Sequence, residues 1–132
     1  MTEQQVERAI LDTSVLIGPS AAPLPGVVAI STASLAELHF GVLVAKDGAT
    51  RAERLRRLSV IQRHFDALPI DDSVAASYGQ LASTVVAAGR QPRRRTMDLL
   101  IAATAHAHGA TLYTRNPADF LGLESLVQVI GV

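Results

Sequence analysis

Short apolar runs alternate with longer segments of helical periodicity along most of this chain. Strands are expected at residues 6–11, 27–30, 67–70, 110–113 and 126–130, and helices at 31–45, 49–66, 71–89 and 97–108. Loops or brief helical turns are expected at 12–18, 19–26, 89–95 and 116–121. Because strands that alternate with helices pair in parallel and carry helices on both faces, the sequence predicts an α/β fold, a three-layer α/β/α sandwich with a central parallel sheet.

The composition fits one compact domain spanning residues 1–132. Of the 132 residues, 48% are hydrophobic, and 12 basic side chains balance 12 acidic ones. A neutral chain has no overall field that attracts nucleic acid or an anionic membrane, so a polyanion must bind at a local basic patch. The sequence has no cysteine, no apolar run long enough to cross a membrane and no secretory leader, and we expect a cytoplasmic protein without a membrane partner.

Four acidic residues follow apolar segments at places where a carboxylate loses hydration. Asp12 ends the first expected strand, and Glu37 lies on the helix after the second strand. Asp98 is near the start of the most apolar helix, and Asp119 follows the strand at 110–113. Ligands of open parallel sheets bind at the carboxyl ends of the strands. We therefore expect all four carboxylates to meet at one rim of the sheet.

Each acid also has an interpretation that requires no ligand. Asp12 can cap the helical turn that follows it, and Glu37 can close a capping box with Ser34. Asp98 can interact with the positive end of a helix dipole, and Asp119 can be an ordinary turn residue. Each of these interpretations accounts for one acid alone, and none accounts for four acids at one rim.

Carboxylates gathered at one rim need a compensating cation. Two carboxylates roughly 4 Å apart repel by about 4 kcal/mol at an effective dielectric constant near 20. Oxygen ligands without His or Cys among them select a hard ion such as Mg²⁺, for which Mn²⁺ can substitute. Such a site suits metal-assisted hydrolysis of a phosphodiester.

Three blocks of sequence, together with the final strand, resemble one known family. The blocks read ILDTSVLI at 10–17, STASLAELHFGV at 31–42 and DLLIAATAHAHGATLYTRNPADF at 98–120. In this order and spacing they resemble the PIN-domain ribonucleases, and specifically the VapC toxins of prokaryotic toxin-antitoxin pairs. The resemblance covers nearly the whole chain. It implies a single PIN domain, a Mg²⁺-dependent endoribonuclease acting on RNA, a homodimer, and inhibition by a VapB-type antitoxin.

The resemblance also implies roles for the acids, all four of which become candidate catalytic residues. Asp12, Glu37 and Asp98 match the three acidic positions of the family motif. At the fourth position many relatives have an acid where this chain has Asn116, and Asp119 is the other candidate. Asp12 and Asp98 would hold the principal Mg²⁺, and Asp119 would support a second ion. Glu37 would bind the metal through water or orient the attacking water.

Side chains beside the acids are candidates for contacts to the substrate. The loop GRQPRRR at 89–95 precedes the third acid by three residues, which places its arginines beside the rim. Arg93, Arg94 and Arg95 are expected to contact the RNA backbone, or else to form a merely solvated loop. Asn116 and the hydroxyl of Thr13 are expected on the substrate side of the rim, where Thr13 can equally serve only as a cap.

Two questions stay open at the level of sequence. The alternative to the enzyme is a non-catalytic PIN domain that acts as an RNA- or protein-binding module. The apolar helix face formed by Leu35, Leu38 and Val42 can bury a homodimer interface, receive an antitoxin helix, or simply pack into the core. No motif specifies which RNA is cleaved or where.

Overall fold

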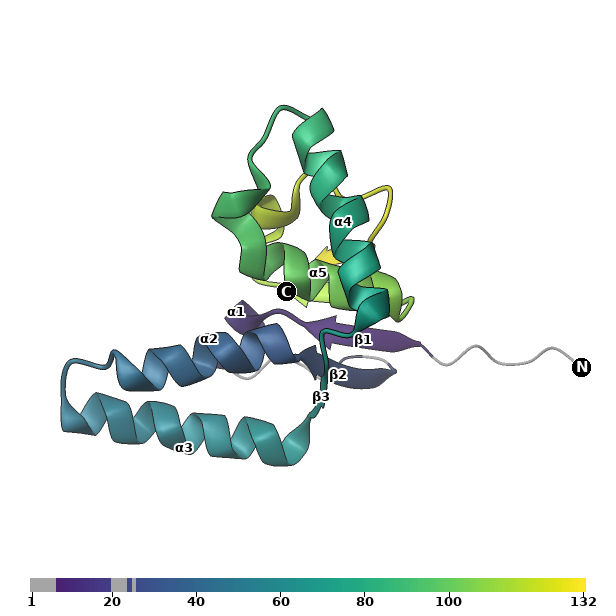
Figure 1. Ribbon diagram of the computed structural model, residues 1–132. Coiled ribbons are helices and arrows are strands. Elements are labelled where there is room, and N and C mark those ends of the chain that lie inside the picture. Colours follow the sequence, from purple (N-terminus) through teal and green to yellow (C-terminus); the bar gives the residue numbers. More distant parts are fainter. Residues whose placement is uncertain (1–6, 20–23, 25) are drawn as a thin grey trace, which may run out of the picture.

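Parallel strands form one five-stranded sheet at the centre of the protein (Figure 1). The computed structural model describes residues 7–19, 24 and 26–132. The strands are β1 (Arg8–Leu11), β2 (Val27–Ser31), β3 (Asp66–Leu68), β4 (Thr111–Thr114) and β5 (Val129–Gly131). Val6, the predicted start of the first strand, and residues 20–23 and 25 of the predicted loop lie outside the described residues.

β1 occupies the middle of the sheet, whose strand order is β3-β2-β1-β4-β5. It pairs in parallel with β2, where Arg8 is opposite Val27, and with β4, where Ala9 is opposite Thr111. β2 and β3 therefore lie on one side of β1, and β4 and β5 lie on the other side. Such a reversal leaves a crevice at the carboxyl ends of the central strands, where ligands bind in open parallel sheets.

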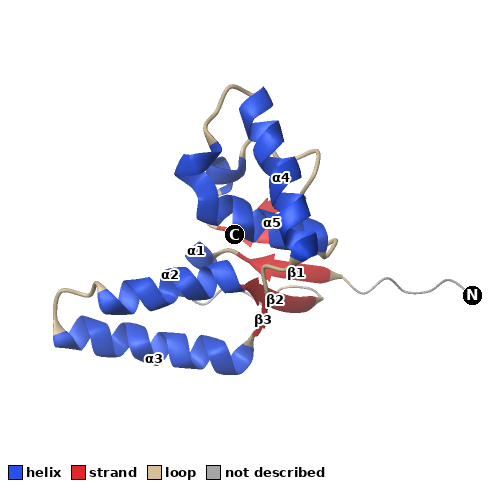
Figure 2. Ribbon diagram, viewed as in Figure 1, coloured by secondary structure: helices blue, strands red, loops and turns tan. Residues whose placement is uncertain are grey.

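Helices cover both faces of this sheet (Figures 1 and 2). They are α1 (Thr13–Ile17), α2 (Thr32–Leu43), α3 (Gly48–His64), α4 (Asp72–Ala87) and α5 (Thr96–Ala107), with the 3₁₀ turns η1 (Pro92–Arg95) and η2 (Pro117–Phe120). α4 packs on α5, and α2 packs on α3 as a hairpin. The predicted α/β/α sandwich with a central parallel sheet is confirmed. In the part of the chain that the structure describes, no helix has the length and hydropathy needed to cross a membrane.

The side chains of the central strands alternate between two apolar cores. Ile10 and Leu112 belong to the core shared with α4 and α5, whereas Leu11 and Tyr113 belong to the core shared with α1, α2 and α3. This period of two is expected for strands that are buried on both faces. Packing on both faces fixes the ends of β1 and β4, and these ends form a rigid base for the residues that follow them.

The predicted element boundaries are shifted by a few residues where local hydrogen bonds compete with the sheet. The last strand begins at Val129 instead of 126, because Leu126 and Val127 both donate their backbone N–H groups to Leu123 O at 2.9 Å in a turn. The predicted loop at 89–95 contains η1, whose first residue, Pro92, has the fixed φ angle that suits the start of a helical turn.

The apolar face predicted on α2 packs inside the molecule. Val42 is buried, and Leu35 and Leu38 pack against the core on the α1 side of the sheet. Core packing thus accounts for Val42, whereas Leu35 and Leu38 are only partly buried, and an interface at this face stays a prediction. The exposed apolar side chains of this helix are Phe40 (66% exposed) and Leu43 (74% exposed).

Candidate active site

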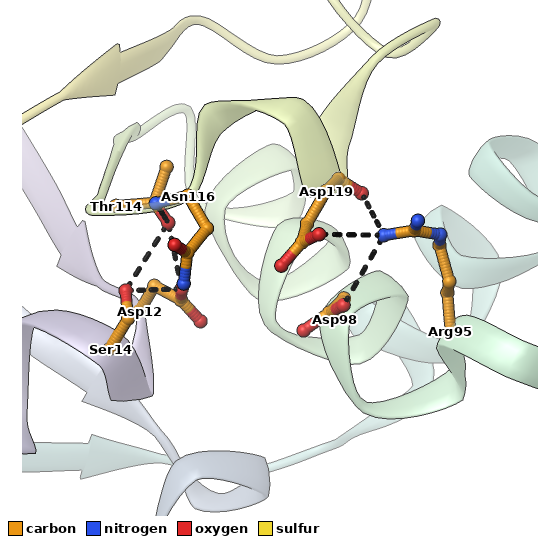
Figure 3. Close-up of polar contacts among 7 residues, drawn as sticks. All are labelled: Asp12, Ser14, Arg95, Asp98, Thr114, Asn116 and Asp119. Carbon is orange, nitrogen blue, oxygen red and sulfur yellow. Dashed lines mark hydrogen bonds and ion pairs between the residues drawn. The ribbon is translucent and has the colours of Figure 1, made fainter.

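Asp12 is buried at the carboxyl end of β1, with 4% of its surface exposed. It precedes α1, but its side chain caps no backbone N–H group of that helix. Instead, Asp12 Oδ2 accepts hydrogen bonds from Ser14 Oγ (2.7 Å) and Thr114 Oγ1 (2.8 Å) (Figure 3). The capping interpretation of Asp12 is therefore wrong. The two hydroxyls offset part of the cost of burying its charge.

Glu37 lies in the second turn of α2, and a side chain from α1 orients it. Ser31 caps α2 by accepting a hydrogen bond from Ala33 N (3.0 Å), so the capping box between Ser34 and Glu37 does not form. Glu37 Oε1 accepts instead from Thr13 Oγ1 (2.7 Å), which lies 2.8 Å from Ser34 Oγ. Thr13, predicted on the substrate side of the rim, thus holds an acid in place.

Asp98 lies in the first turn of α5, close to the other three acids. The pKa of its carboxyl is raised from 3.8 to about 6, first by partial burial and then by the negative charges of Asp12, Asp119 and Glu37, while Arg95 acts in the opposite direction. Asp12 directly follows β1, Glu37 lies in the second turn of α2, and Asp119 lies in η2. The structure thus places Asp12, Glu37 and Asp119 near enough to Asp98 for their charges to raise its pKa, and a helix dipole alone does not explain this shift.

Arg95 faces two of the acids, Asp98 and Asp119, from one side (Figure 3). Its Nη1 atom is 3.0 Å from Asp119 Oδ1 and 3.9 Å from Asp98 Oδ2, and it also donates to the main-chain oxygen of Asp119 at 3.1 Å. The sequence predicts Arg95 as a contact to RNA. Its Nη1 atom is engaged by acids of its own chain, but 40% of the side chain is exposed, and a contact to RNA stays a prediction.

A network of hydroxyls connects Asp12 to the loop after β4. Thr114 is fully buried and accepts a hydrogen bond from Asn116 N (3.0 Å) in addition to the bond that it donates to Asp12. Asn116 is itself exposed at the rim. Ser14 is a further site residue that the family motif does not indicate, and its place two residues after Asp12 puts its hydroxyl within reach of that carboxylate. Ser14 Oγ also accepts a hydrogen bond from Arg115 N (3.0 Å).

A basic cavity of about 540 Å³ adjoins the rim on the side of η1. Arg94 and Arg95 line it together with Arg90, which sequence reasoning did not single out. Arg93 is exposed and does not line this cavity. The three arginines form a region that attracts phosphate. This region lies beside the acids, which attract a cation.

The donor atoms at the rim fit a hard divalent ion. Asp12, Glu37 and Asp98 offer only carboxylate oxygens, which are the ligands that Mg²⁺ and Mn²⁺ prefer. Asp12 Oδ2 is held by hydroxyls, which leaves Oδ1 without a hydrogen-bond donor among the described residues. Among the described residues, no group of three or more His, Cys, Asp or Glu side chains is arranged so that it could hold a metal ion. A divalent ion would relieve the repulsion that raises the pKa of Asp98.

Comparison with known proteins assigns this arrangement to a family. The family model for the PIN domain matches residues 9–121. Ribonuclease VapC8 of Mycobacterium tuberculosis is 40% identical over 109 residues, which cover 80% of this chain and 96% of that protein. The chain belongs to the VapC-type PIN-domain family. All four rim acids of this PIN domain lie within the matched residues.

Two solved structures share the fold of this PIN domain. One is the crystal structure of VapBC-5 from Mycobacterium tuberculosis, a member of the VapBC family of toxin-antitoxin systems. It matches with a TM-score of 0.84 and 35% identity over 95% of this chain and 98% of that chain. The other is FitAcB from Neisseria gonorrhoeae, with a TM-score of 0.76 and 30% identity over 93% of this chain and 96% of that chain.

Proposed function

We propose that this PIN domain is a Mg²⁺-dependent endoribonuclease and the toxin of a VapBC-type toxin-antitoxin pair in the prokaryotic cytoplasm. The main support is the effect of three acids from separate elements on the carboxyl of Asp98. A rim where the charges of three acids act on a fourth is suited to a cation and ill suited to a neutral ligand. The similarity to proteins named as VapC ribonucleases supplies the substrate class.

Asp12 and Asp98 would hold the principal Mg²⁺, with Glu37 beside it. When bound, the ion lowers the pKa of water and neutralises charge that develops on the phosphate. Ser14 and Thr114 keep Asp12 Oδ1 directed to the rim by holding its other oxygen. Thr13 fixes one oxygen of Glu37, so that the other can accept a proton from the attacking water. Hydrolysis by this route leaves a 5′-phosphate and a 3′-hydroxyl.

The basic cavity beside η1 would bind the RNA backbone. Arg90 and Arg94 line this cavity, and neither forms an ion pair with an acid among the described residues. Phosphates adjacent to the cleaved bond would then be held by these two side chains. This assignment retains Arg94 from the predicted set, adds Arg90, and gives Arg95 a role within the rim.

The partners of the proposed toxin are a VapB-type antitoxin and a second copy of the chain. The solved relatives are toxin-antitoxin complexes, which supports the antitoxin. Phe40, Leu43 and Val44 expose apolar surface near the turn between α2 and α3, a feature typical of protein interfaces. Light scattering at high concentration should detect a dimer, and a monomer would contradict that part of the proposal.

Cleavage of RNA by the purified, antitoxin-free protein tests the enzyme directly. We expect cleavage with Mg²⁺, none with EDTA, and none for Asp98→Asn. Asp72→Asn makes the same charge change at an exposed residue in the first turn of α4 and should leave cleavage unchanged. RNA binding without cleavage by the wild type would instead support the non-catalytic binding module. Mapping the cleaved ends across total RNA would identify the substrate.

A further inference from the structure

The carboxylate rim has two electrostatically unequal halves. Asp98 and Asp119 lie 3.9 Å and 3.0 Å from Nη1 of Arg95. Among the described residues, neither Asp12 nor Glu37 forms an ion pair with a basic side chain. The half of the rim formed by Asp98 and Asp119 therefore contains a cationic side chain, and the half formed by Asp12 and Glu37 has none among the described residues.

Contacts with the backbone hold the guanidinium at this position. Nη1 donates to the main-chain oxygen of Asp119 at 3.1 Å, a contact that does not depend on where the Asp119 carboxylate points. Arg95 is also the last residue of η1, immediately before α5, so its Cα atom is fixed between two helical segments. The positive charge is thus held at the rim by contacts within the chain, on a side chain that is 40% exposed.

This charge occupies the half of the rim where a second divalent ion would bind. Two ions in one carboxylate site each need acidic ligands, and the second would rely on Asp119 together with an acid shared between the ions. Arg95 cancels one of the two negative charges of Asp98 and Asp119, and it already takes Asp119 Oδ1 as its partner. A divalent ion placed there would meet a like charge at the distance of an ion pair.

We propose that Arg95 takes the place of a second divalent ion, so that this PIN domain binds a single metal ion on the side of Asp12, Glu37 and Asp98. The inference rests on the proposed metal-dependent function. It assigns Asp119 as the anchor of Arg95 instead of a metal ligand. Arg95 is thereby the residue that determines the metal stoichiometry of the site.

Counting bound Mn²⁺ tests the proposal without relying on activity. The antitoxin-free full chain is titrated with Mn²⁺, and free Mn²⁺ is followed by electron paramagnetic resonance. We expect one ion per chain for the wild type and two for Arg95→Met, which removes the charge but keeps a long side chain. Arg95→Lys, which retains the charge, should bind one. Arg93→Met removes the same charge two residues away, where no rim acid is contacted, and should also bind one.

The outcomes separate this inference from the function on which it rests. Two ions bound by the wild type, or one ion bound by folded Arg95→Met at any affinity, would overturn the role of Arg95 and leave the metal-dependent nuclease intact. No Mn²⁺ bound by any variant would overturn both. Circular dichroism checks that each variant is folded, and Arg95→Gln provides the same charge removal with a hydrogen-bond donor if Arg95→Met does not fold.

Discussion

Thr114 and Asp12 are 102 residues apart in the sequence, yet Thr114 Oγ1 donates a hydrogen bond of 2.8 Å to Asp12 Oδ2 inside the protein. The pairing of β1 with β4, which places Leu11 opposite Tyr113, brings the next residue of each strand side by side. The bond selects which oxygen of Asp12 faces the rim. A strand pairing therefore sets the geometry of the proposed metal ligand.

Replacing Thr114 by valine should weaken both folding and metal binding. The change keeps the shape but removes the donor to Asp12 and the acceptor for Asn116 N, and the loss of a buried hydrogen bond costs about 1 to 2 kcal/mol. Loss of a group that orients a metal ligand should lower Mn²⁺ affinity about 10-fold. Urea unfolding and Mn²⁺ titration measure the two effects. Thr111→Val removes a hydroxyl from the same strand that donates to Gln128 Oε1 in a solvent-exposed hydrogen bond, and it should change both quantities far less.

Asp98→Asn should stabilise the metal-free protein at neutral pH. The folded-state pKa of about 6 exceeds the ordinary value of 3.8, so ionisation of Asp98 opposes folding. The destabilisation caused by ionised Asp98 is absent below about pH 3.8, grows between pH 3.8 and 6, and is complete above pH 6. The pKa shift sets an upper limit of about 3 kcal/mol on the increase in the free energy of unfolding. Solvent screening at a side chain that is 30% exposed reduces the expected increase to about 1 kcal/mol.

Urea unfolding in EDTA at pH 7.5 and pH 4 measures this difference between Asp98→Asn and the wild type. We expect the variant to be more stable at pH 7.5 and the two proteins to converge at pH 4. A variant less stable than the wild type at pH 7.5 would mean that the attraction between Asp98 and Arg95 outweighs the repulsion from the other acids.

Thr13→Val should slow RNA cleavage while leaving the fold intact. The substitution removes the hydrogen bond that holds Glu37 Oε1, and a misplaced Glu37 orients the attacking water poorly. We expect about a 10-fold lower kcat with an unfolding midpoint close to that of the wild type. Thr13→Ser restores the hydroxyl and should restore the rate. Equal rates for the valine variant and the wild type would show that Glu37 needs no help from Thr13.

Arg90→Ala and Arg94→Ala should weaken RNA binding in a salt-dependent manner. Each loses a cation at the basic cavity, so the magnitude of the slope of log affinity against log salt should fall by about 0.7 per arginine for single-stranded RNA. Binding is measured in the Asp98→Asn background so that the RNA stays intact. Arg51→Ala and Arg63→Ala on the exposed face of α3 serve as controls. Equal losses at all four positions would indicate non-specific attraction.

The sequence was sufficient to predict the sheet and the acids of the rim. Apolar runs mark the strands, and Asp12 and Asp119 follow two strands that must end at the same edge of a parallel sheet. The role of Arg95 could not be predicted in this way. Its ion pair depends on η2, which brings back Asp119 from 24 residues further along the chain. Local pattern therefore locates the acids, whereas the partners of their side chains depend on tertiary packing.

Thr13 illustrates the same limit on a smaller scale. Its position after Asp12 predicts a hydroxyl at the rim, and the structure places it there. Its partner is Glu37 on α2, 24 residues away, and this contact exists only because α1 and α2 pack together at the end of the sheet.

The thermal unfolding midpoint of the antitoxin-free protein, measured with and without Mn²⁺, tests most directly whether Asp12, Glu37 and Asp98 form a cation site. Binding to the folded state alone raises the midpoint. We expect millimolar Mn²⁺ to raise it by several degrees for the wild type and not for Asp12→Asn or Asp98→Asn. An unchanged midpoint for the wild type at millimolar Mn²⁺ would contradict the proposed metal site and the nuclease mechanism that depends on it.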